Sequence, residues 1–224
     1  MHLILDTIVG SHAYGLALPG SDLDRRGIFL APPDALWAIG GHEKCVTHPT
    51  EDTTHWELAH FVGHALKGSH AALDVLWAPV VSITDDGHLL HDARRAFLSR
   101  RALPSMRGHA VANIHVVREA TVVGPAEWKR LMHAARLALV GETLARTGDY
   151  RIDMTDYRDA LLALRGGSIP LADALARVEA LVAAFTATIA DTPLPAGPDV
   201  DAVQRVVTTI RARSARAWLD SHGY

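Results

Sequence analysis

The residues best suited to chemistry lie in one stretch, Gly10 to Asp24, which reads GSHAYGLALPGSDLD. Gly10-Ser11 predicts a turn without bulky side chains, where the backbone can approach a phosphate. Ten residues later, Asp22 and Asp24 flank Leu23, and on a strand both carboxylates would project to one side while the leucine turns into the core. Because paired carboxylates repel each other unless a cation lies between them, and because Mg²⁺ and Mn²⁺ prefer oxygen ligands, the stretch predicts a metal-dependent phosphate site.

A small α+β unit is predicted around this stretch. Apolar, β-prone runs predict strands over residues 2–9, 22–31, 45–47 and 52–56. The turn-rich segment 10–21 fits a loop with a short helical turn. Apolar side chains at helical spacing predict a helix over 56–67 that covers the sheet, and the apolar segment 71–78 fits either a helix or a strand. Together these elements form an N-terminal unit over residues 1–85.

From residue 86 the pattern changes to helices. Proline and glycine stops separate the predicted helices, over residues 88–100, 105–121, 125–147, 156–165, 171–190 and 199–221. The segment 192–198, TPLPAGP, is linker-like, but its length fits a loop between helices better than a domain boundary. We therefore expect an α+β fold class, with a small mixed β-sheet domain over 1–85 and an all-α domain over 86–224.

Composition excludes several classes of protein. The chain of 224 residues carries a formal charge of −3, which argues against a generally basic nucleic-acid-coating protein. No apolar run approaches the roughly 20 residues of a membrane span, and the N-terminus lacks the apolar centre of a signal peptide. We expect a cytoplasmic protein without membrane contact. The single cysteine, Cys45, cannot form an internal disulfide, and we expect it to be buried or half-buried.

Histidines are numerous, with fourteen in the chain. His60 and His64 stand four residues apart, but the glutamate of a metalloprotease HExxH motif is missing between them. Most of the histidines are therefore expected to be surface or capping residues.

GSHAYG followed by SDLD resembles the Gly-Ser plus Asp-x-Asp signature of nucleotidyltransferases of the DNA polymerase β superfamily. The flanking residues, SDLDRRG, look like the predicted nucleotidyltransferase branch associated with RNA-repair pathways, in which an arginine-glycine pair follows the aspartates. The similarity covers residues 8 to about 150 and includes Lys129, His133 and Arg136, whose spacing places them on one helix face. One departure is Ser69-His70, where that branch commonly has Asn-Pro.

The resemblance implies transfer of a nucleoside monophosphate from an NTP to an acceptor hydroxyl, with RNA as one candidate acceptor, and release of pyrophosphate. A two-metal site for this reaction needs about three carboxylates, and Asp22 and Asp24 supply two. Strand alternation puts Asp52 and Glu57 on opposite sides of the next strand, so only one can face the metals. We prefer Glu57, because it adjoins the helix that aligns with the family, although it would also serve as a first-turn helix acid. Asp52 is the alternative.

The expected nucleotide contacts come from two regions. Around the carboxylates they are Gly10, Ser11, Tyr14 and Arg26. From the later helix, Lys129, His133 and Arg136 would form a cationic face toward phosphate. Each has a structural alternative, such as a core tyrosine, a surface arginine or a solvated helix face. The last helix adds a basic stripe that would suit a nucleic-acid backbone, formed by Arg205, Arg211, Arg213 and Arg216.

Two other functions fit the same residues. A non-catalytic nucleotide- or RNA-binding module would keep the fold but lack a complete carboxylate set. An antitoxin-like protein would modify or sequester a partner chain. Fold alone does not choose among these functions, because function resides in the site.

Overall fold

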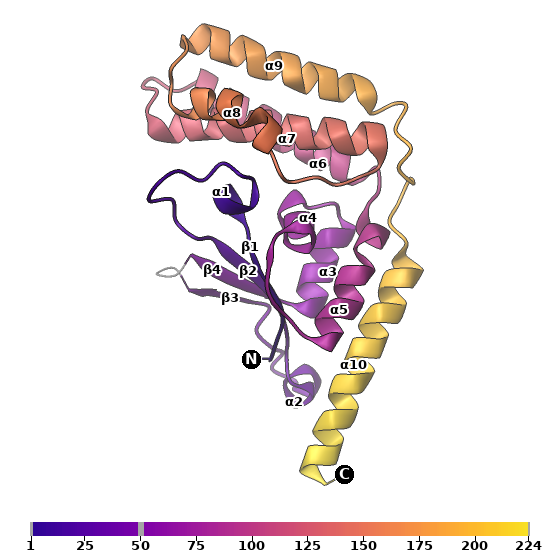
Figure 1. Ribbon diagram of the computed structural model, residues 1–224. Helices are drawn as coiled ribbons and strands as arrows, with labels where there is room; N and C mark the ends of the chain where they lie inside the picture. The colour runs from indigo at the N-terminus through magenta and orange to yellow at the C-terminus, as the bar shows by residue number, and fades with distance from the viewer. Residues whose placement is uncertain (1, 49–51, 224) are drawn as a thin grey trace.

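A five-stranded mixed sheet forms the N-terminal part of the computed structural model, which describes residues 2–48 and 52–223 (Figure 1). Its strands are β1 (His2–Ile8), β2 (Arg25–Leu30), β3 (Cys45–His48), β4 (Thr53–Glu57) and β5 (Val80–Ile83). They lie in the order β3-β4-β2-β1-β5, in which β2 and β4 are parallel and all other neighbours are antiparallel. The four expected strands are present, whereas β5 was not predicted.

Helices cover this sheet on one side (Figure 1). They are α3 (Leu58–Leu66), α4 (His70–Trp77) and α5 (Asp85–Asp92). The single turn α1 (Gly10–Ala13) follows β1, and the short helix α2 (Pro33–Trp37) follows β2 and lies beyond the end of the sheet. The segment 71–78, which fitted a helix or a strand, is therefore helical. Helix α5 begins earlier than predicted because the Thr84 side chain accepts a hydrogen bond from the Gly87 N–H. A separate 3₁₀ turn, Arg94–Phe97, follows it.

A helical layer follows the sheet unit (Figure 1). It contains α6 (Ala102–Arg118), α7 (Pro125–Thr147), α8 (Arg158–Arg165) and α9 (Leu171–Thr188). Helix α7 has the predicted bounds, with Pro125 in its first turn and Gly148 in a left-handed conformation after its end. No helix in the described part of the chain is long and apolar enough to cross a membrane.

One continuous hydrophobic core joins the sheet unit to the helical layer. Among its fully buried side chains are Leu73 of α4, Leu103 of α6, Leu131 of α7 and Phe185 of α9. The position of α7 relative to the sheet is therefore fixed by packing, so side chains from both regions can face one site. The division of the chain near residue 85 stays a prediction.

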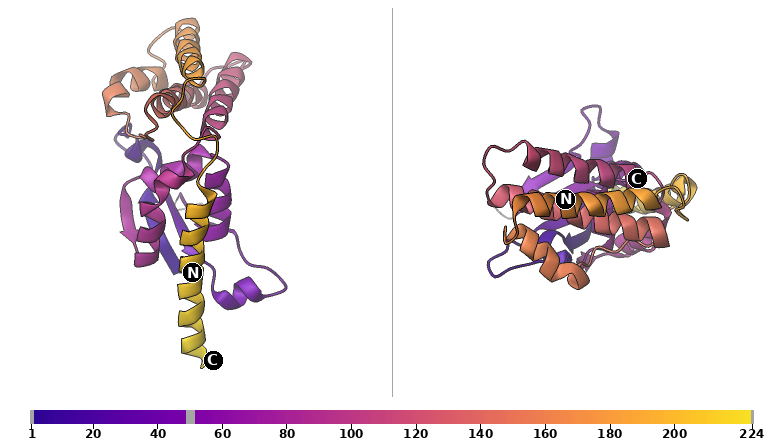
Figure 2. Two further views of the ribbon diagram at one scale, coloured as in Figure 1. Left: turned by 90° about the vertical axis from the view of Figure 1, so that its right-hand side faces the viewer. Right: turned by 90° about the horizontal axis from the view of Figure 1, so that it is seen from above.

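The last helix, α10 (Val200–His222), leaves the helical layer and runs beside the sheet unit (Figure 2). There it packs against α2, α3 and α5. Arg211 pairs with Glu57, and an Arg213 nitrogen lies 3.3 Å from an Asp86 oxygen. Two of the four arginines of the possible basic stripe are therefore engaged by carboxylates of the sheet unit.

Cys45 also differs from expectation. It is exposed on β3, an edge strand of the sheet, rather than buried or half-buried. An edge strand has a neighbour on only one side, so its side chains have less to pack against.

Candidate active site

A cleft of about 480 Å³ lies where the sheet unit meets α7. Its walls come from the turn after β1, the loop before β2, the start of β2, and helices α4, α7 and α8. Most of the predicted site residues line it, namely Gly10, Ser11, Tyr14, Asp22, Asp24, Arg26, Lys129 and His133. Arg136, Glu57 and the alternative Asp52 are not among the lining residues. His70, Asp74 and Arg165 line the cleft without having been predicted.

The two aspartates lie in the loop before β2, whereas a strand had been predicted to begin at Asp22. Leu23 between them is 47% exposed instead of buried in the core. The loop is nevertheless fixed, because the Val9 N–H donates to the Asp24 carbonyl at 2.9 Å. Both carboxylates thus face the cleft beside the Gly10-Ser11 turn.

Asp24 lies in an environment that disfavours its ionised form. Burial and the neighbouring charge of Asp52 raise the pKa of its carboxyl, while Lys129 and Arg26 oppose this shift. A divalent cation would remove the repulsion between the carboxylates. The charges around Asp24 would therefore favour a cation bound by Asp22 and Asp24.

Position 10 has to be a glycine because the Asp24 side chain lies against it. Its φ is +68°, and a Cβ at this position would overlap with the Asp24 carboxylate. We expect Gly10→Ala to destabilise the fold by about 1–2 kcal/mol and to displace Asp24, so that any activity falls more than stability does. Thermal unfolding together with pyrophosphate release measures both effects. Gly41→Ala is the matched control, since Gly41 has φ +76° but open space around its Cβ position.

Asp52 adjoins the aspartate loop across β2 and β4. These strands pair in parallel, with Arg25 opposite Thr53, and the Arg25 N–H donates to the Asp52 carbonyl at 3.0 Å. Asp52 itself lies in the turn before β4, with a left-handed φ of +46°, and its charge acts on the Asp24 carboxyl. Asp52 is therefore an acidic neighbour of Asp24, although it does not line the cleft.

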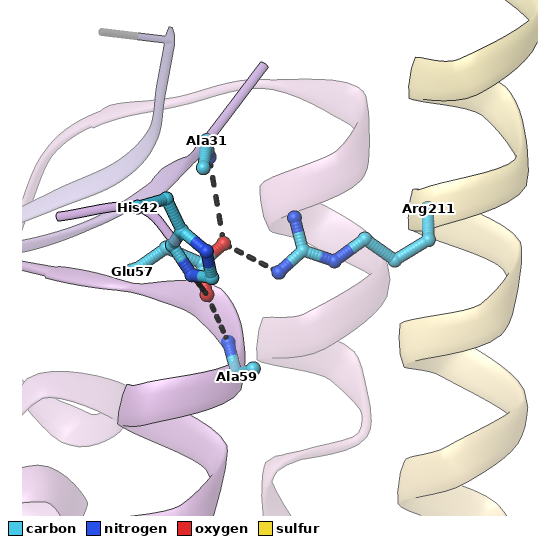
Figure 3. A network of polar contacts seen from close by, with 5 residues as sticks. All are labelled: Ala31, His42, Glu57, Ala59 and Arg211. Carbon is cyan, nitrogen blue, oxygen red and sulfur yellow. Dashed lines mark hydrogen bonds and ion pairs between the residues drawn. The ribbon is translucent and has the colours of Figure 1, made fainter. Parts of the chain in front are cut away.

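Glu57 lies at the opposite end of β4 and is fully buried (Figure 3). Its carboxylate accepts hydrogen bonds from the Ala59 N–H at 2.7 Å, from the Ala31 N–H at 3.4 Å and from Arg211. In the β2–β4 pairing Glu57 lies opposite Phe29, four residues beyond the Arg25–Thr53 pair. The two pairs are therefore roughly 13 Å apart along the strands. The preference for Glu57 over Asp52 as third metal ligand is therefore corrected: Glu57 caps α3 and binds α10.

Helix α7 presents Lys129 to the cleft, but the predicted cationic face is only partly present. Arg136 is buried, with its guanidinium carbon 3.8 Å from the Tyr14 ring centroid. Burial, followed by nearby Arg136 and Lys129, lowers the pKa of His133 to about 4, so its imidazole is neutral at pH 7. The cleft's cations are thus Lys129, Arg26 and the unpredicted Arg165 of α8.

A buried polar network joins the turn after β1 to the helical layer. Asp74 of α4 accepts hydrogen bonds from the hydroxyls of Tyr14 at 2.6 Å and Tyr150 at 2.7 Å, and an Arg136 nitrogen lies 3.7 Å from it. Tyr14 is therefore a core tyrosine whose hydroxyl is bound inside the protein, which was the alternative to a nucleotide contact. It also lines the cleft. The only signal for Asp74 in the sequence was a carboxylate within an otherwise apolar helix.

His70 and His133, both on the cleft wall, predict a pH dependence of stability. Burial is the main cause that lowers the pKa of each to about 4. In the unfolded chain a histidine has a pKa near 6.5, so on acidification the unfolded state takes up a proton before the folded state does. The free energy of unfolding should therefore fall as the pH drops from about 6.5 to about 4. Urea titrations across this range should show a weaker fall for His133→Gln. His115→Gln, at an exposed position, should follow the parent.

The described residues alone do not complete a metal centre. Within the ranges 2–48 and 52–223, no three His, Cys, Asp or Glu residues come together in a way that could hold a metal ion. Asp22 and Asp24 supply carboxylate oxygens of the type that Mg²⁺ and Mn²⁺ prefer, and Asp52 is their acidic neighbour.

The mixed sheet, the Gly-Ser turn facing paired aspartates and the helix across the cleft define an α+β nucleotidyltransferase domain followed by a helical region. The chain belongs to the RNA repair pathway DNA polymerase beta family (RlaP), whose model matches residues 1–207. The suspected RNA-repair branch is thereby confirmed, and the match extends beyond residue 150 into α10. Comparisons with curated proteins and with solved structures gave no significant match.

Proposed function

We propose that this protein is a metal-dependent nucleotidyltransferase that transfers a nucleoside monophosphate from an NTP to an acceptor hydroxyl and releases pyrophosphate. The observation that carries the proposal is the cleft itself, where Asp22 and Asp24 face the Gly10-Ser11 turn and Lys129. Carboxylates suit divalent metals, while a glycine-containing backbone turn and a cation suit phosphate.

Each wall of the cleft has a distinct role in this reaction. Asp22 and Asp24, with Asp52 as the proposed third ligand, would hold Mg²⁺ or Mn²⁺. Bound cations of this kind stabilise the attacking and leaving oxygens of an in-line displacement. Lys129 and Arg165 would bind the phosphates that become pyrophosphate, because both are cations on the helical side. The neutral His133 imidazole would donate or accept a hydrogen bond.

A labelled-nucleotide assay tests the proposal. Each α-labelled NTP is incubated with the pure protein, Mg²⁺ or Mn²⁺ and pooled RNA, and both pyrophosphate release and transfer of label to RNA are measured. The family's description makes RNA the first acceptor to try. Small hydroxyl compounds and proteins form the other acceptor arms. Absence of release with every NTP and every acceptor class would refute the proposal.

The second candidate is a nucleotide- or RNA-binding module without catalysis. It is favoured by one observation, that no complete set of three metal ligands comes together among the described residues. This candidate predicts NTP binding that Mg²⁺ leaves unchanged and no pyrophosphate release. Calorimetry with and without Mg²⁺ separates it from the enzyme.

A further inference from the structure

A pair of histidines on α3 lies apart from the cleft. His60 and His64 are one helical turn apart, and their Nε2 atoms lie 3.3 Å from each other. Their rings are nearly perpendicular, with centroids 4.6 Å apart. Neither residue lines the cleft. Their imidazole nitrogens therefore converge on one point beside the helix.

The separation of these nitrogens matches the geometry of a tetrahedral metal ion. With Zn–N distances of about 2.05 Å and a tetrahedral angle, two nitrogen ligands lie about 3.3 Å apart. The right angle of an octahedral ion would bring them to about 3.0 Å. Imidazole nitrogen is a preferred ligand of Zn²⁺ but not of Mg²⁺. The spacing thus selects a different class of ion from the carboxylates of the cleft.

Neighbouring residues keep the two rings in place. Trp56 stacks on His64, with ring centroids 6.2 Å apart and an interplanar angle of 22°, and Trp56 itself packs against Phe61 in the core. His60 is half-buried on the same helix face. Because these contacts hold the rings, the site needs little reorganisation to bind a metal.

We propose that His60 and His64 form a surface Zn²⁺ site, with water in the remaining coordination positions. No third His, Cys, Asp or Glu joins them within the described ranges. A zinc ion held by two protein ligands keeps open positions and exchanges with solvent, unlike a closed structural site. Without metal, one Nε2–H donates a hydrogen bond to the other Nε2 across this distance, and a bound Zn²⁺ would replace that proton.

The site is tested by calorimetric titration of Zn²⁺ into the full chain. Millimolar Mg²⁺ is present to compete with Zn²⁺ at the carboxylates of the cleft. Loss of one supporting partner commonly weakens metal binding about 10- to 100-fold, and loss of a ligand should cost at least as much. We therefore expect His60→Ala and His64→Ala each to weaken the tightest Zn²⁺ event at least tenfold. Retention on an immobilised Zn²⁺ resin should fall in parallel.

Matched controls separate this site from the other histidines and from the cleft. His109→Ala removes one ring of a second T-shaped pair, with His70, in which the His109 Nδ1 instead lies 2.9 Å from the Ser105 carbonyl. It should bind Zn²⁺ as the parent does, and so should Asp22→Asn. The proposal is overturned if both α3 variants retain the parent affinity, or if Asp22→Asn alone removes the tight event. Circular dichroism verifies that all variants fold.

Discussion

Asp24→Asn should abolish nucleotidyl transfer and, at the same time, raise the melting temperature of the metal-free protein. Activity should fall at least about 10³-fold, because a metal ligand contributes several kcal/mol of transition-state stabilisation. Stability should rise because burial and the charge of Asp52 disfavour the Asp24 carboxylate. The two effects have opposite signs, which an unfolded or damaged variant would not show.

The sign of the stability effect follows from the direction of the pKa shift. An acid whose pKa is higher in the folded than in the unfolded state stabilises the fold when protonated, and this stability is lost as the pH rises through the folded pKa. Once ionised, the Asp24 carboxylate therefore destabilises the fold, and Asn removes that charge. Such a trade between stability and activity is common at functional sites.

Adding a divalent cation should make the parent protein more stable than Asp24→Asn. Mg²⁺ binds the folded state and neutralises the carboxylates, so it should raise the melting temperature of the parent but not of Asp24→Asn. Differential scanning fluorimetry at pH 7 with and without Mg²⁺, together with the pyrophosphate assay, measures both parts. Asp191→Asn, at an exposed position, should behave as the parent. Equal responses of parent and Asp24→Asn to Mg²⁺ would contradict a metal at Asp24.

Local patterns in the sequence predicted the parts of the site that local geometry determines. The Gly10-Ser11 turn, the two aspartates and the Lys129 face of α7 all line the cleft. Helix α7 could be bounded because Pro125 and Gly148 are strong start and stop signals. These features depend on residues that are neighbours in the chain.

Features set by distant parts of the chain were missed. Arg136 has the spacing of a cleft residue but points into the core, where Tyr14 and Asp74 surround it. Strand alternation was applied to Asp52 and Glu57, but Asp52 lies in the turn before β4, and the distance of Glu57 from the aspartate loop follows from the parallel register of β2 and β4. That register, and the return of α10 to Glu57, result from tertiary packing rather than from any local motif.

Asp52→Asn and Glu57→Ala should therefore affect different properties, the first activity and the second stability. Asp52→Asn should fold normally but lose roughly 10²- to 10³-fold in activity and much of the stabilisation by Mg²⁺, because it removes the proposed third ligand. Glu57→Ala should retain the Mg²⁺ response but lose about 3–5 kcal/mol of stability, since Arg211 is left without its carboxylate. Urea unfolding and the Mg²⁺-dependent melting shift distinguish the two outcomes.

A double variant shows whether Glu57 acts through Arg211 alone. Glu57→Gln with Arg211→Met removes both charges and keeps an acceptor for the Ala59 N–H, so it should be more stable than Glu57→Gln by itself. A structural role for Glu57 requires this recovery, because the main cost of the single change is an unpaired buried charge. If instead Glu57→Gln abolished the Mg²⁺ response while Asp52→Asn kept it, Glu57 would be the third ligand after all, and its contact with α10 would belong to a different conformation from the active one.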